Sequence, residues 1–148
     1  MFCLDTNIII GVMTKRRPFA MQRLQAELDR RTRLLIPAVV LYELRYGADK
    51  SALPERNHAR LDDFLTAEFE VMPFDEADAA QASLIRAHLE KRGAPIGPYD
   101  ILIAAQARVR NAVLVTSNRR GFGRVPGLMV TDWDAGWATA QLKASAQV

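Results

Sequence analysis

Short apolar runs alternate along the chain with longer segments in which apolar residues recur every three or four positions. The runs lack the period-two alternation of a half-exposed strand, so we expect each to form a short strand buried on both faces. They cover residues 2–4, 34–36, 71–72, 113–116 and 128–130. The first run is cut by Asp5-Thr6-Asn7 and resumes as three isoleucines, so an acidic residue directly follows the first predicted strand.

The segments with helical periodicity lie between these runs. They predict helices over residues 6–13, 19–31, 37–48, 55–69, 75–92 and 99–108. The apolar stripe of the fourth helix ends at Phe69, and the fifth helix is expected to place Leu84 on its core side. The last helix is almost wholly apolar, which is typical of a buried helix. The polar stretch 117–127 is expected to be a loop.

The alternation of short strands and helices predicts an α/β fold with a central, mainly parallel sheet of four to five short strands flanked by helices. Successive carboxyl ends of such strands converge on one edge of the sheet, where ligands bind in open α/β folds. No internal repeat or linker divides the sequence, so residues 1–134 are expected to form one domain. Residues 135–148 are Ala-rich and are expected to be a C-terminal tail or a short terminal helix.

Composition narrows the class of protein. The 148 residues are 49% apolar and 25% charged, which is ordinary for a globular domain large enough to bury a core. The one cysteine, Cys3, excludes an internal disulfide and a cysteine-based zinc site. No apolar run approaches the length of a membrane span, and the N-terminus lacks the basic region of a signal peptide. We therefore expect a cytoplasmic protein with no membrane partner.

Three acidic residues stand in apolar surroundings. Asp5 follows the first strand, Glu43 lies on the helix after the second strand, and Asp100 opens the buried helix. Asp100 can be explained as a helix-dipole acid and Glu43 as half of a surface ion pair, but their common edge favours one shared site. Carboxylates that close together repel and raise one another's pKa, and all-oxygen ligands suit Mg²⁺ or Mn²⁺. Such a site fits hydrolysis of a phosphodiester.

Basic residues add a second clue. The net charge is +3 and the sequence pI about 9.3, a modest excess that by itself does not identify a nucleic-acid partner. The residues gather in local clusters, which are Lys15-Arg16-Arg17, Arg108 with Arg110, and Arg119-Arg120 with Arg124. Each cluster is either a phosphate-facing surface or a solvated face. Together with the acids, they suggest hydrolysis of a nucleic-acid backbone.

The motifs that carry these residues resemble those of PIN domains. Leu-Asp-Thr-Asn at 4–7, Tyr-Glu-Leu-Arg-Tyr-Gly-Ala at 42–48, the helix at 99–107 and Val-Thr-Ser-Asn at 115–118 stand in the order seen in that family. Val-Pro-Gly-Leu at 125–128 and the later Asp132-Trp133 complete the match. The sequence is most similar to VapC-type toxins of type II toxin–antitoxin pairs, over about residues 1–134.

This resemblance implies an endoribonuclease that depends on Mg²⁺ or Mn²⁺ and cuts tRNA or ribosomal RNA. It further implies a homodimer that a cognate VapB-type antitoxin holds inactive by inserting a segment near the acidic site. By position, the metal-binding and catalytic acids are Asp5, Glu43 and Asp100. Asn7 and Thr116 are then expected to support the site by hydrogen bonding, and Asn118 to lie at its rim.

One position departs from the family pattern. Many relatives carry a further acid just before the phenylalanine of the loop after the last motif, where this chain has Gly121 before Phe122. The fourth acid is missing at this place, so we expect either a single metal ion held by the three acids or a contribution from Asn118 through a water. The neighbouring arginines are instead expected to contact substrate phosphates. The residues expected to contact RNA are Arg16, Arg17, Arg119, Arg120 and Arg124.

Two other interpretations compete with the nuclease. Haloacid-dehalogenase-like phosphatases also place an aspartate after the first strand, but they need a second one two positions later, where this chain has Asn7. A PIN-like module that has lost catalysis would bind RNA or protein without cutting. Retention of three mutually repelling acids argues against that module, because a pure binder has no need of them.

Overall fold

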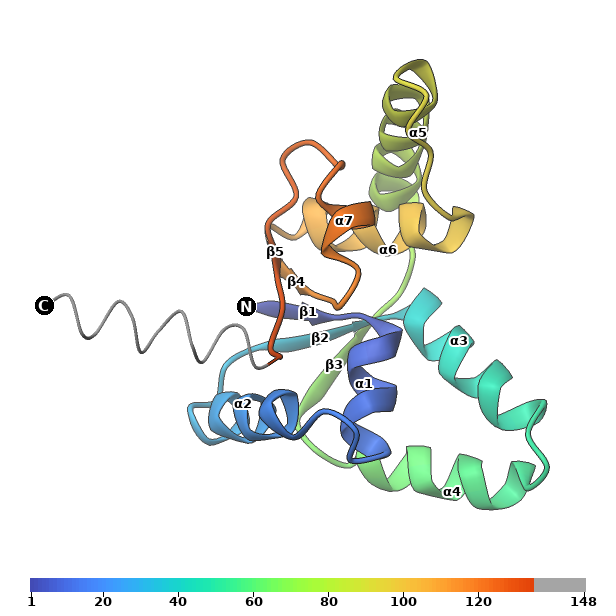
Figure 1. Cartoon of the computed structure of the whole chain (residues 1–148), viewed down its shortest axis with the longest axis vertical. Helices are drawn as coiled ribbons and strands as arrows, with labels where there is room; N and C mark the ends of the chain where they lie inside the picture. The colour runs from blue at the N-terminus through green and yellow to red at the C-terminus, as the bar shows by residue number, and fades with distance from the viewer. Residues whose placement is uncertain (135–148) are drawn as a thin grey trace, which may run out of the picture.

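The computed structural model describes residues 1–134, and its centre is a sheet of parallel strands (Figure 1). The strands are β1 (Phe2–Leu4), β2 (Leu34–Pro37), β3 (Phe69–Met72), β4 (Val113–Val115) and β5 (Val130–Thr131). Their order across the sheet is β3-β2-β1-β4-β5, and every pairing is parallel. The predicted α/β class with a parallel sheet of short strands is confirmed.

Helices connect the strands and cover the sheet. They are α1 (Thr6–Met13), α2 (Pro18–Asp29), α3 (Ala38–Asp49), α4 (Pro54–Phe64), α5 (Glu76–Lys91), α6 (Pro98–Val109) and α7 (Arg119–Phe122). In Figure 1, α1 to α4 lie on one side of the strands, whereas α5, α6 and α7 lie on the other. Within residues 1–134, no helix has the length and apolar character needed to cross a bilayer.

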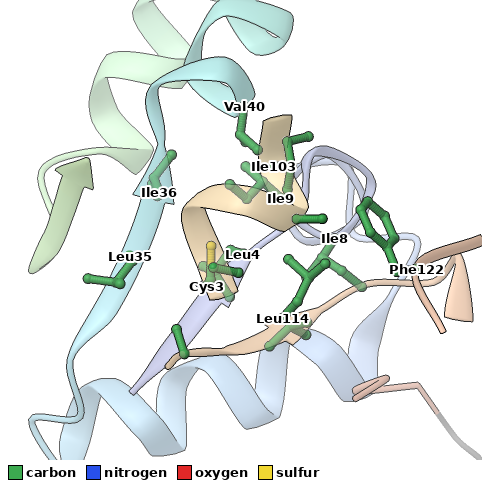
Figure 2. Packing of buried hydrophobic residues seen from close by; sticks show 14 of the residues in the cluster. Cys3, Leu4, Ile8, Ile9, Leu35, Ile36, Val40, Ile103, Leu114 and Phe122 are labelled. Carbon is green, nitrogen blue, oxygen red and sulfur yellow. The ribbon is translucent and has the colours of Figure 1, made fainter. Parts of the chain in front are cut away.

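The core forms where the central strands meet the inward faces of α1, α3 and α6 (Figure 2). Leu35 and Ile36 of β2, Leu114 of β4 and Ile103 of α6 are fully enclosed. Cys3 lies in the same core, and burial raises the pKa of its thiol far above the usual range. Cys3 is therefore an inert apolar group, as its place in a buried strand predicts.

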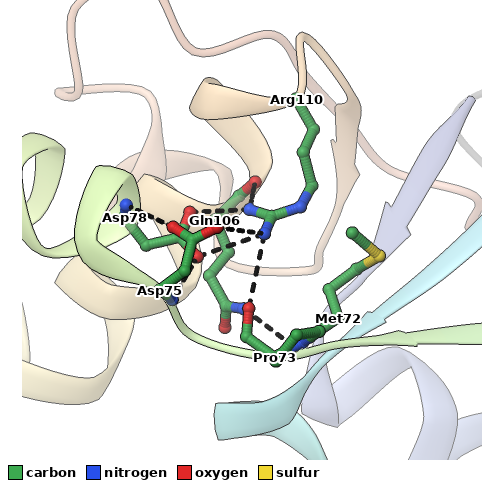
Figure 3. A network of polar contacts seen from close by, with 6 residues as sticks. All are labelled: Met72, Pro73, Asp75, Asp78, Gln106 and Arg110. Carbon is green, nitrogen blue, oxygen red and sulfur yellow. Dashed lines mark hydrogen bonds and ion pairs between the residues drawn. The ribbon is translucent and has the colours of Figure 1, made fainter.

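Arg110 ties α6 to α5 through a buried ion pair (Figure 3). Its guanidinium donates to the Asp78 carboxylate at 2.6 Å and to the carbonyl oxygen of Gln106, while the Gln106 amide donates to the carbonyl oxygen of Met72. Burial alone raises the pKa of Asp78, but the hydrogen bonds from Arg110 and from the backbone of Asp75 outweigh burial and lower that pKa. Arg110 therefore acts as a structural residue.

Three sequence predictions about local structure were wrong. Phe69 belongs to β3, because α4 ends at Phe64, and the two rings stack with 4.9 Å between centroids. Leu84 is 61% exposed on α5 and not on its core side. The predicted loop 117–127 contains the single turn α7. The predicted tail 135–148 lies outside the described residues.

Candidate active site

Asp5 lies at the carboxyl end of β1, where its backbone N–H donates to the carbonyl oxygen of Val115 on the neighbouring strand β4. Its side chain caps α1 by accepting the Thr6 N–H at 2.8 Å on Oδ1. The Thr116 hydroxyl donates to the other oxygen, Oδ2, at 2.7 Å. Both oxygens are thus held, and a buried carboxylate is fixed at the edge where two parallel strands end.

Thr6 joins Asp5 to the second acid. The Thr6 hydroxyl donates to Oε1 of Glu43 at 2.7 Å, so the same residue holds Asp5 by its backbone and Glu43 by its side chain. Thr6 is a site residue that the sequence motifs did not predict. Its position next to the predicted acid Asp5 could have indicated a role in the site. However, threonine is common near the start of a helix, so its presence there did not point to a function.

Asp100 is the third acid and lies in the first turn of α6, after the N-terminal Pro98. Its pKa is raised from 3.8 to about 6, first by burial and then by the charges of Asp5 and Glu43. Burial likewise raises the pKa of Asp5, with a further contribution from Glu43. The three predicted acids are therefore electrostatic neighbours, although they come from distant parts of the sequence.

The described residues contain no cluster of three or more His, Cys, Asp or Glu side chains already gathered as a metal site. Thr6 links Asp5 to Glu43 by hydrogen bonds, and Asp100 is coupled to both acids by their charges. The three side chains are not already gathered around one point. Their chemistry nevertheless fits a hard divalent cation, because carboxylate oxygens are its preferred ligands. A cation would also offset the repulsion that raises the pKa of Asp100.

Thr116 is the predicted supporting residue with the clearest position. Its hydroxyl is fully buried, donates to Asp5 and accepts the backbone N–H of Asn118 at 3.0 Å. The side chain of Asn118 caps α7 by accepting the Gly121 N–H. A Cβ at Gly121 would lie 2.7 Å from the Asn118 amide nitrogen, so this cap fills the space of a side chain at position 121.

The remaining predicted site residues lie around this centre. Asn7 is exposed on α1, and no hydrogen bond joins its side chain to another residue of the described range 1–134. Arg16, Arg119 and Arg120 are exposed. Arg17 instead forms an ion pair with Asp134.

Arg124 is also exposed, and its guanidinium donates to the carbonyl oxygen of Pro95. Arg108 is held by the Gln81 side chain and the carbonyl oxygen of Pro126. Arg16, Arg119 and Arg120 are therefore the predicted basic residues best placed to meet a ligand.

An apolar groove of about 250 Å³ begins at Glu43 and runs between α1, α3 and α4. Its walls include Ile10 and Met13 of α1, Leu44 and Gly47 of α3, and Leu61 of α4. The acids therefore lie beside a surface that can hold an apolar side chain.

Comparison of the sequence with known proteins shows the family to which this chain belongs. A family model described as the PIN domain matches residues 2–128. The tRNA(fMet)-specific endonuclease VapC of Shigella flexneri is 40% identical over 132 residues, which span 89% of this chain and 97% of that protein. Ribonuclease VapC2 of Haemophilus influenzae is 39% identical over the same shares.

Solved structures agree with this match. VapBC2 from Rickettsia felis, bound to a DNA fragment from its promoter, is similar with a TM-score of 0.84 and 34% identity, covering 90% of this chain and 98% of that chain. DNA-bound VapBC from Salmonella typhimurium is similar with a TM-score of 0.82 and 39% identity, covering 89% of this chain and 97% of that chain.

The parallel sheet and the family match together define a PIN-domain protein. Within that family the chain belongs to the VapC ribonucleases, which are hydrolases. This membership favours the nuclease over the PIN-like binding module.

Proposed function

We propose that the protein is the toxin of a toxin–antitoxin pair and a divalent-metal-dependent endoribonuclease. The observation that carries the proposal is the chain of hydrogen bonds from Thr116 through Asp5 and Thr6 to Glu43, next to an Asp100 whose pKa is raised to about 6. Such a concentration of restrained carboxylates costs stability, which is expected at a functional site.

Mg²⁺ or Mn²⁺ is the proposed cofactor, and Asp5, Glu43 and Asp100 are the residues that would hold it. When bound, such a cation lowers the pKa of water and stabilises charge on phosphate oxygens. The protein supplies the orientation of its acids. Thr116 fixes the Asp5 carboxylate from β4, and Thr6 fixes Glu43 from α1. Asn7 is proposed to support the site by hydrogen bonding, and Asn118 to lie at its rim.

RNA is the proposed substrate, in particular tRNA or ribosomal RNA in the cytoplasm. A tRNA-specific endonuclease is among the relatives. The exposed Arg16, Arg119 and Arg120 are proposed to contact its phosphates, with smaller contributions from Arg17 and Arg124, whose guanidinium groups already have partners in the fold.

A VapB-type antitoxin is the proposed partner, since the similar solved structures are VapBC complexes. The apolar groove between α1, α3 and α4 is proposed to receive an amphipathic segment of it, because the groove leads directly to Glu43. We also propose a homodimer, which sedimentation of the purified protein would measure.

Cleavage of total bacterial RNA by the purified protein tests the proposal. Reactions with Mn²⁺, with EDTA, and with Asp100→Asn in Mn²⁺ should be compared on one gel. Discrete fragments are expected only with the metal and the intact carboxylate. Equal cleavage in EDTA would contradict the metal requirement. RNA binding without cleavage would favour the binding module.

A further inference from the structure

All three tyrosines of the sequence gather on one exposed surface. Tyr42 and Tyr46 project from α3 and Tyr99 from α6, and their exposed fractions are 51%, 54% and 46%. We call these three side chains the tyrosine platform. Burial does not explain them, because α3 packs into the core through Val40, Leu44 and Ala48.

The rings of the tyrosine platform contact one another in a defined arrangement. Tyr42 and Tyr46 are nearly parallel, at 19° with 6.4 Å between centroids, and Tyr99 meets Tyr42 edge to face at 5.6 Å. The pKa of the Tyr42 hydroxyl is raised, chiefly by its interaction with Tyr99. The Lys50 ammonium lies 5.0 Å from the centroid of Tyr46. The three rings of the tyrosine platform therefore already contact one another in the protein without a ligand.

Its position links the tyrosine platform to the acids. Tyr42 directly precedes Glu43, and Tyr99 directly precedes Asp100. The two helices that supply these acids also supply the rings, and Tyr46 lies about one helical turn from Glu43 on α3, where side chains share a face. We therefore expect a strand bound at the acids to pass close to the tyrosine platform. Lys50 adds a positive charge at its outer end, where a phosphate of that strand would be attracted.

We propose that the tyrosine platform binds unpaired bases of the RNA substrate by stacking. Aromatic faces with a nearby cation are what a single strand requires, because every base has a π-face and every linkage a negative charge. The substrate class is then RNA with an unpaired segment at the cut, such as a loop. This inference rests on the proposed nuclease function.

Tyr46→Ala and Tyr46→Phe test it, since Tyr46 is three positions from Glu43 and both substitutions suit a helix surface. The probe is a short single-stranded RNA carrying a fluorescent adenine analogue, whose emission falls when it stacks, and the competitor is the same RNA paired into a duplex. Binding is measured in EDTA, and cleavage separately in Mn²⁺. Phe74→Ala, at an exposed ring outside the tyrosine platform, is the matched control.

Loss of quenching and roughly tenfold weaker binding of the single strand in Tyr46→Ala, with recovery in Tyr46→Phe and no change in Phe74→Ala, is the expected result. Binding equal to wild type in Tyr46→Ala would overturn the inference. Weaker binding together with a lower molecular mass in sedimentation would also overturn it, by showing a protein interface. If wild type stacks the probe but never cleaves RNA, the nuclease proposal fails while the tyrosine platform stands.

Discussion

The hydroxyl of Thr6 donates to Oε1 of Glu43 at 2.7 Å and so connects the start of α1 to the middle of α3. Because the Thr6 N–H also binds Asp5, this residue sets the relative position of two acids. The arrangement makes Thr6 a positioning residue of the proposed site, although it does not itself carry charge.

Thr6→Val tests that role by removing the hydroxyl at nearly constant volume. We expect activity to fall about tenfold, because groups that orient metal ligands typically contribute 10–100-fold. Thr6→Ser keeps the hydroxyl and should recover most of the activity. Cleavage rates and melting temperatures should be measured together, and undiminished cleavage in a folded Thr6→Val protein would contradict the role.

Metal binding should stabilise the fold. Adding Mg²⁺ or Mn²⁺ is expected to raise the melting temperature, since a ligand at about 100 times its Kd contributes about 2.7 kcal/mol. Asp5→Asn should abolish most of this shift. Thermal scans of both proteins across a metal titration provide the measurement. An equal rise in the variant would place the metal elsewhere.

Asp100 should make the metal-free protein more stable in mild acid. Its pKa is about 6 in the folded protein against 3.8 for a free side chain, so the folded state holds the proton more tightly. The contribution of this proton to the free energy of unfolding is complete below about pH 4 and is lost as the pH rises through about 6.

Asp100→Asn should therefore raise the metal-free stability at neutral pH by about 1 kcal/mol, a value reduced for solvent screening because the side chain is partly exposed. The difference from wild type should shrink toward about pH 4. Denaturant titrations at several pH values in EDTA measure it. Glu68→Gln, at an exposed acid, is the control, and a gap that persists in acid would disprove the assignment.

The exposed arginines of α7 should set the salt dependence of RNA binding. Replacing both Arg119 and Arg120 by alanine is expected to reduce the slope of log K against log salt by about one to two. Replacing Lys91 and Arg92, an exposed basic pair at the end of α5, provides the matched control. If the slope changes in the control pair but not in α7, the RNA lies on a different face.

Gly47 offers a way to block the apolar groove. A Cβ at this helical position meets no atom within 4 Å, so substitution is not expected to disturb the fold. Gly47→Ala should add up to about 1 kcal/mol of stability through helix propensity, while Gly47→Gln fills the groove and should weaken antitoxin binding. Calorimetry with the cognate antitoxin distinguishes them, and unchanged affinity in Gly47→Gln would exclude the groove.

The apolar runs and the helical periodicity of the sequence predicted most of the strands and helices, and pointed to the candidate acids. Asp5 was assigned to the proposed site from the buried strand before it, and Asp100 from the buried helix after it, because an acid beside a wholly apolar segment requires a reason. Phe69 was misplaced, since its spacing from Leu65 fits a helix that a turn in fact ends. The proximity of Tyr99 to Tyr42 was not predictable, because it depends on how α6 packs beside α3.

The hydrogen bond between Thr116 and Asp5 spans 111 positions of the sequence. β1 is made before β2 and β4, yet it lies between them in the sheet. A nascent chain therefore carries Asp5 without the hydroxyl that orients it until Thr116 has been made. Assembly of the proposed nuclease site therefore waits until β4 has been made and has paired with β1.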